Sequence, residues 1–138
     1  MRVLLSYLVH LFTISGVLLS FLALLASIEQ NLELVFFCLA LALFVDGVDG
    51  SMARMVDVKR HTPNINGENL DNIIDYLNYV FVPVFVIYWV DFVPSGMEIV
   101  AAFIILTVSC YTFANSKIKT SDFYFSGFPA LWLSLIHI

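Results

Sequence analysis

The sequence predicts an all-α, polytopic transmembrane helical bundle, and three observations support this fold class. First, 61% of the 138 residues are hydrophobic, and the mean hydropathy is +0.94. Second, only 12% of the residues are charged, which is about half the share usual in a soluble domain. Third, the charged residues fall at the edges of long apolar runs or between them. The net charge of −5, with no basic patch to neutralise phosphates, also excludes a nucleic-acid partner.

The first apolar run extends from Val3 to Ile28 and contains no charged residue. Its 26 residues are enough to cross a hydrocarbon core of roughly 30 Å. Arg2 followed by an apolar run is also the pattern of a signal peptide, but the apolar part of a signal peptide usually has only about 7–15 residues. A transmembrane helix is therefore the favoured interpretation, and a signal peptide is the alternative.

The second apolar run is too short to span a bilayer by itself. It has 12 uncharged residues, Leu34 to Val45, which cover only about 18 Å of helix. To reach the necessary length of about 20 residues, the helix has to continue to roughly Ala53. Asp46 and Asp49 then lie within the membrane or at its edge.

The third apolar run repeats this argument in reverse. Tyr76 to Val90 has 15 uncharged residues and reaches 20 only if the helix starts at Asp71. Pro83 lies inside this run, and we expect it to kink the helix rather than end it, because neighbours can re-satisfy freed backbone groups. Two further spans are expected, from Ile99 to about Ser116 and from Phe123 to Ile138.

The basic residues predict how these spans are oriented. If the N-terminus is cytoplasmic, every Lys and Arg falls on the cytoplasmic side, and all the charged residues of the opposite loops are acidic. The positive-inside rule favours this arrangement, which brings both aspartate pairs to the cytoplasmic face. The polar segment from Met55 to Asn66 is then a cytoplasmic loop. The six basic residues are Arg2, Arg54, Lys59, Arg60, Lys117 and Lys119.

The two aspartate pairs are suited to divalent cations. Asp46 and Asp49 are three residues apart and share a helix face, and so do Asp71 and Asp75, which are four apart. Each buried carboxylate costs up to about 3 kcal/mol to insert into a bilayer, and like charges repel. Mg²⁺ or Mn²⁺ would offset both costs, and four carboxylates can hold two ions, as in phosphoryl-transfer sites.

Two alternatives exist for these aspartates. They can be solvated groups at helix ends, which is the ordinary explanation for a single aspartate. They can also form a cation-transport site, although such sites usually lie near the membrane midplane rather than at one face.

Eight residues of this stretch resemble the signature of the CDP-alcohol phosphotransferase family. The interval of 12 residues between Arg54 and Gly67 is longer than in most of that family and is similar to the bacterial branch that makes phosphatidylcholine. The resemblance runs from about His10 to Trp132 and implies a bundle of about six helices, with residues 1–132 as an incomplete membrane domain. The matching pattern is Asp46-x2-Asp49-Gly50-x2-Ala53-Arg54 followed by Gly67-x3-Asp71-x3-Asp75.

The resemblance implies a metal-dependent enzyme of the bacterial inner (cytoplasmic) membrane. It would transfer a phosphatidyl group from CDP-diacylglycerol to choline, giving phosphatidylcholine and CMP, with two Mn²⁺ or Mg²⁺ ions as cofactors. Its partners would be these substrates and the lipid bilayer, and a homodimer is a further option. The alternatives are the same transfer to serine, inositol or a glycerol phosphate and, from another class, cation transport.

The resemblance also implies roles for the carboxylates. Asp46, Asp49 and Asp71 would bind the metal ions. Asp75 would share the second ion and act as the catalytic general base on the alcohol.

Substrate-binding roles are implied for the remaining signature residues. Gly50, Ala53 and Arg54 would meet the CDP moiety, with Gly67 packing close by. The planar guanidinium of Arg54 suits a phosphate, and a plain positive-inside anchor is its alternative. Choline favours aromatic faces, so Tyr76 and Tyr79, next to Asp75, are the weaker candidates for the acceptor site.

The last part of the sequence predicts an incomplete bundle. Phe123 to Ile138 has only 16 residues, and no sixth span follows. Residues 133–138 resemble the translation of a sequencing-library adapter joined after Trp132, and an ordinary apolar helix segment is the alternative. A third interpretation of function follows, in which this chain alone is inactive. A comparison of the 138-residue chain with a longer reading frame tests it.

Overall fold

The computed structural model describes residues 2–90, 93–94 and 96–114. Within these residues the chain is helical and has no strand, which confirms the all-α prediction. The chain divides into two compact units, Met1–Asn78 and Tyr79–Ile138. The predicted span Phe123–Ile138, Lys117, Lys119 and the suspected tail lie outside the described residues. The helices are α1 (Arg2–Ile28), α2 (Leu32–Val56), α3 (Val58–His61), α4 (Gly67–Tyr76), η1 (Leu77–Phe81), α5 (Val82–Trp89) and α6 (Glu98–Ala114).

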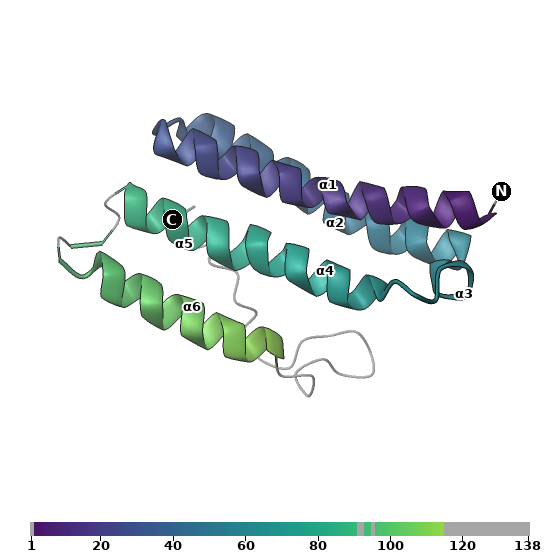
Figure 1. Cartoon of the computed structure of the whole chain (residues 1–138). Helices are drawn as coiled ribbons and strands as arrows, with labels where there is room; N and C mark the ends of the chain where they lie inside the picture. The colour runs from purple at the N-terminus through teal and green to yellow at the C-terminus, as the bar shows by residue number, and fades with distance from the viewer. Residues whose placement is uncertain (1, 91–92, 95, 115–138) are drawn as a thin grey trace. The chain divides into compact units, whose positions relative to one another are not determined.

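In the first unit, α1 and α2 form a helical hairpin and lie side by side (Figure 1). The turn between them has Gln30 in the left-handed region, with φ 57°. The backbone N–H of Gln30 donates to Ser27 at 3.0 Å, and that of Asn31 donates to Ala26 at 2.9 Å, which is the hydrogen-bond pattern of a Schellman motif. Asn31 then caps α2 by accepting a hydrogen bond from the N–H of Leu34 at 3.1 Å.

The two faces of α1 have opposite compositions. Its buried face carries a small hydroxyl residue at every seventh position, namely Ser6, Thr13, Ser20 and Ser27. Its exposed face carries a leucine at the same spacing, namely Leu4, Leu11, Leu18 and Leu25. Large apolar residues outside and small residues inside are the reverse of a soluble amphipathic helix. This arrangement is typical of helices that pack together in lipid.

Two helical segments are long and apolar enough to cross a membrane by length and composition, Arg2–Ile28 and Gly67–Trp89. The first agrees with the predicted span within one residue. α6 is a shorter apolar helix of 17 residues, and its start is within one residue of the predicted Ile99. α2 has 25 residues, and the spanning role predicted for it stays a prediction.

The segment between α2 and α4 is more helical than predicted. α2 continues to Val56, and α3 occupies part of the predicted loop Met55–Asn66. Asp57 ends α2 with φ 55°, and its backbone N–H bonds to the carbonyls of Ala53 and Arg54. A left-handed residue at a helix end is usually Gly or Asn. Because an aspartate is not a typical residue at this position, the sequence did not indicate that the helix ends at Val56.

The helical segment that carries the second aspartate pair starts at Gly67, before the predicted start at Asp71. Asn66 explains the earlier start, because its side chain accepts hydrogen bonds from the N–H groups of Glu68 at 3.1 Å and Asn69 at 3.2 Å. Such an N-cap satisfies donors that the first helical turn leaves free. The aspartates of α4 are thus placed well inside a capped helix rather than at a frayed end.

Pro83 acts on this segment through a π-helical turn. Pro83 has no N–H, so the carbonyl four residues earlier loses its usual partner. The π-helical η1 directly precedes α5, where Pro83 stands in the first turn. The proline therefore does not end the helical segment, and the π-helical turn before it is one of the known responses to a broken hydrogen-bond ladder. The kink itself stays a prediction. In the second unit, α5 packs against α6.

Candidate active site

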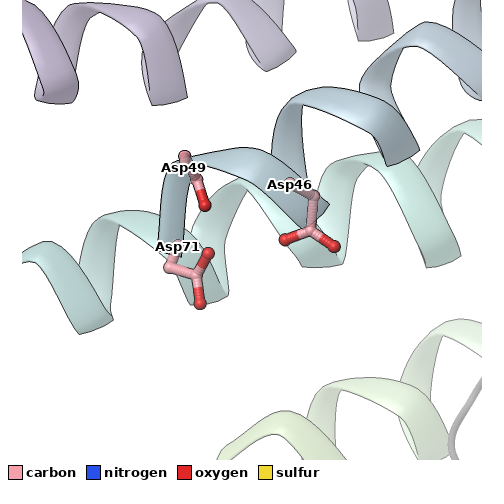
Figure 2. Close-up of side chains that lie close together, drawn as sticks. All are labelled: Asp46, Asp49 and Asp71. Carbon is pink, nitrogen blue, oxygen red and sulfur yellow. The ribbon is translucent and has the colours of Figure 1, made fainter. Parts of the chain in front are cut away.

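Three of the four predicted aspartates converge from two helices. Asp46 and Asp49 lie in the second half of α2, and Asp71 lies in α4. Each can offer a carboxylate oxygen, and these oxygens all lie within 4.8 Å of one another. Figure 2 shows the three side chains directed toward one shared space. Asp49 is buried, whereas Asp46 and Asp71 are half-buried, so the group is reachable from outside.

Asp75 lies one turn beyond Asp71 on α4 and is half-buried. Its carboxyl group hydrogen-bonds with that of Asp46 and interacts electrostatically with Asp71 and Asp49. The four carboxyl groups therefore form one cluster, with three in mutual reach and Asp75 beside them. Their roles as ligands and base stay predictions.

The donor set fits a hard divalent cation. The group Asp46, Asp49 and Asp71 supplies only carboxylate oxygens, which are the ligands that Mg²⁺ and Mn²⁺ prefer. Two unit charges about 5 Å apart repel by roughly 3 kcal/mol at an effective dielectric constant near 20. A bound cation would remove this repulsion. The cluster thus has both the chemistry and the energetic reason to hold a metal ion.

The signature residues after Asp49 continue along α2. Arg54 is exposed, and its Nη2 donates to Oγ of Ser51 at 3.2 Å. A Cβ added at Gly50 would meet Nη1 of Arg54 at 3.7 Å, so the guanidinium lies across this glycine. Ala53 is half-buried. The structure thus places the guanidinium of Arg54 over Gly50, the residue that follows Asp49.

Gly67 stands at the first turn of α4 and packs close to α1. A Cβ at this position would meet Cε1 of His10 at 3.5 Å. Tyr76 ends α4 in the first unit, whereas Tyr79 lies in η1 and belongs to the second unit. Both tyrosines are half-buried. Their role in holding the acceptor stays a prediction.

α1 contributes contacts to the site on the side of α2. Thr13 hydrogen-bonds the carboxylate of Asp49. One turn earlier, Nε2 of His10 and Oγ1 of Thr62 are 3.1 Å apart. The hydroxyl of Thr62 also donates to the carbonyl of Val58 at 3.0 Å. The sequence singled out neither contact, because the partners lie far apart in the chain.

α1 also contacts α4. A Cβ added at Gly16 would meet Cγ2 of Ile74 at 2.8 Å, and the hydroxyl of Ser20 donates to Oδ1 of Asn78. Ile74 directly precedes Asp75 on α4, and Asn78 lies three residues after it, in η1. The signal that could have revealed them is the hydroxyl residue at every seventh position of an otherwise apolar run, which marks a helix–helix contact face.

Comparison with protein families matches the one described as CDP-alcohol phosphatidyltransferase to residues 5–132. The chain belongs to this family. The eight signature residues all fall within the matched region, and the helical architecture is the one that the resemblance implied. As a member of the CDP-alcohol phosphatidyltransferase family, the chain is related to enzymes rather than to cation channels.

Three relatives illustrate the similarity. A phosphatidylcholine synthase of Mesorhizobium japonicum is 44% identical over 127 residues, covering 92% of this chain and 47% of the relative. The phosphatidylcholine synthase of Pseudomonas aeruginosa is 45% identical, with 90% and 52% covered. That of Borreliella burgdorferi is 39% identical, with 95% and 56% covered. The chain thus spans about half the length of these relatives. No solved structure matches the chain.

Proposed function

We propose that the chain carries the catalytic site of a metal-dependent enzyme that transfers a phosphatidyl group from CDP-diacylglycerol to choline. The products are phosphatidylcholine and CMP. The observation that carries this proposal is the group of Asp46, Asp49 and Asp71, whose oxygens lie within 4.8 Å of one another, with Asp75 beside it. Relatives named phosphatidylcholine synthase support choline as the acceptor.

Asp46, Asp49 and Asp71 would hold the divalent ions, Mn²⁺ or Mg²⁺, with Asp75 sharing the second. When bound, the ions neutralise the diphosphate and the charge that develops on the leaving CMP. Arg54 reaches the same region from α2, and its planar guanidinium pairs with phosphate oxygens. Gly50 and Ala53 leave room for the nucleotide to approach the backbone.

Asp75 is the proposed general base. Its carboxylate accepts the proton of the choline hydroxyl, and the alcohol oxygen forms a bond to the phosphorus that carries diacylglycerol. The bond from this phosphorus to the oxygen of CMP breaks, and CMP leaves with the electron pair. Asp75 lies beside Asp46, so the proposed base stands next to the carboxylates that would hold the ions. Asp75 then returns its proton to water.

Choline also carries a quaternary ammonium group. This group has no N–H with which to donate a hydrogen bond, so it has to be recognised in another way. Aromatic faces within about 6 Å bind such a cation. Tyr76 and Tyr79 follow Asp75 directly in the chain, and they are the proposed acceptor residues. The positive-inside distribution of Arg2, Arg54 and the basic residues of α3 supports a cytoplasmic site.

An acceptor screen tests the proposal. Protein in detergent or nanodiscs is mixed with labelled CDP-diacylglycerol, Mn²⁺ or Mg²⁺, and one of choline, serine, inositol or glycerol phosphate. The expected result is metal-dependent release of CMP with label in phosphatidylcholine alone. Label in another phospholipid would replace choline as the acceptor. Ion flux without CMP release would instead favour transport.

A further inference from the structure

Thr13 is a buried hydroxyl residue next to a buried carboxylate. Its side chain is only 8% exposed, and that of Asp49 is only 5% exposed. The hydroxyl of Thr13 hydrogen-bonds Asp49, which also accepts from the backbone N–H of Gly50. Asp49 is the buried member of the three-carboxylate group. Its orientation therefore depends on protein groups rather than on water.

The hydroxyl of Thr13 has a choice of two acceptors but only one hydrogen to donate. Its own helix offers the carbonyl of Val9, at a distance of 3.3 Å. Two other helical threonines, whose hydroxyls bond only to the preceding turn, lie closer to that carbonyl: Thr107 at 2.7 Å and Thr112 at 2.9 Å. A hydroxyl bond to a charged acceptor is roughly twice as strong as one to a neutral acceptor. Thr13 is therefore drawn toward Asp49 and away from its own helix.

α1, the helix that carries Thr13, also packs against α4, which carries the other aspartates of the cluster. Within the described residues, α2 and α4 contact each other less extensively than each contacts α1. Gly16 and Ser20, on the same face as Thr13, contact Ile74 of α4 and Asn78 just beyond α4, in η1. α1 therefore determines how far the carboxylate of α2 stands from those of α4.

We propose that Thr13 is a positioning residue that orients Asp49 for metal binding. Its hydroxyl holds one oxygen of Asp49, which leaves the other oxygen directed toward Asp46 and Asp71. The inference rests on the metal site of the proposed function. Outer partners of this kind, when removed, typically cost about 10–100-fold in metal affinity or activity.

The experiment measures Mn²⁺ binding directly, by electron paramagnetic resonance of free Mn²⁺ in titrations of the purified protein in nanodiscs. Thr13→Val replaces the hydroxyl by a methyl group of similar size, and Thr13→Ser keeps the hydroxyl. Thr107→Val is the matched control, because the hydroxyl of Thr107 bonds only to its own helix. The expected result is an Mn²⁺ dissociation constant raised about 10–100-fold in Thr13→Val, with Thr13→Ser and Thr107→Val as in the wild type.

Transfer activity in the same samples should show a shifted Mn²⁺ requirement in Thr13→Val, with the rate recovering at high Mn²⁺. Wild-type Mn²⁺ affinity in Thr13→Val would overturn the inference, and so would an equal loss in Thr13→Ser, which would point to the γ-methyl group. A wild-type protein that binds no Mn²⁺ would overturn the proposed metal site itself. If Thr13→Val fails to fold in a metal-free melting experiment, Thr13→Ala makes the same comparison without an added methyl group.

Discussion

Ile74 of α4 lies so close to Gly16 of α1 that a Cβ added to the glycine would stand 2.8 Å from Cγ2 of the isoleucine. That methyl group branches directly from Cβ, and β-branched side chains in helices have one strongly preferred rotamer. The isoleucine therefore cannot turn away at low cost. The two helices meet at a separation that only a glycine permits.

Gly16→Ala should push α1 away from α4 and disturb the aspartate cluster. Overpacking of this kind typically costs about 1–3 kcal/mol, so we expect a lower melting temperature and slower phosphatidyl transfer. Thermal melting in detergent and the CMP-release assay measure the two effects. Gly47→Ala is the control, since a Cβ there would meet nothing within 4 Å. Equal behaviour of the two variants would contradict the close approach.

Ser20→Ala should destabilise the contact between α1 and Asn78, just beyond α4, without changing its shape. The hydroxyl of Ser20 donates to Oδ1 of the buried Asn78, and a buried acceptor left without its donor costs about 1–3 kcal/mol. Ser15→Ala is the matched control, because the hydroxyl of Ser15 bonds only within its own helix, to Phe12 at 2.6 Å. The prediction fails if both variants melt at the same temperature.

Asp75→Asn should abolish turnover while CDP-diacylglycerol still binds. The amide cannot accept the proton of the alcohol, but it keeps the size of the side chain and removes one negative charge from the cluster. Binding of the lipid nucleotide by titration calorimetry and CMP release with choline separate the two steps. A general base typically contributes about 10²–10⁴-fold to rate. Turnover near the wild-type rate would remove Asp75 from that role.

Arg54→Lys should weaken CDP-diacylglycerol binding although it keeps the positive charge. A lysine cannot reproduce the planar fork of a guanidinium, and a hydrogen bond to a charged group contributes about 1.5–3 kcal/mol. We therefore expect KM for CDP-diacylglycerol to rise about tenfold or more. Arg60→Lys in α3 is the control for a general effect of basic residues. If Arg54→Lys leaves KM unchanged, Arg54 is an orientation anchor only.

The helical class and the place of the carboxylates were predictable because they depend on local counts. Leu34 to Val45 is too short for a span, so the helix had to include Asp46 and Asp49, and α2 does continue past both. The same reasoning extended the next helix back to Asp71. Neither argument needs knowledge of which helix packs on which.

The contacts that hold the carboxylates were not predictable in the same way. Thr13 with Asp49 and Ser20 with Asn78 join residues on different helices, and nothing in the local pattern of either partner names the other. Asp57 was missed for another reason, because its left-handed backbone, with φ 55°, carries none of the usual glycine or asparagine marking. Side-chain contacts between residues far apart in the sequence can be assigned only once the packing of the helices is known.

The bridging position of α1 also sets an order of events during synthesis. The hydrogen-bond partners of His10 and Ser20, Thr62 and Asn78, come 52 and 58 residues later in the chain. Contacts between residues that are far apart in the sequence form later than local contacts. The nascent α1–α2 hairpin therefore exists for a time with Asp46 and Asp49 lacking the aspartates of α4, and the carboxylate cluster is complete only when α4 packs beside them.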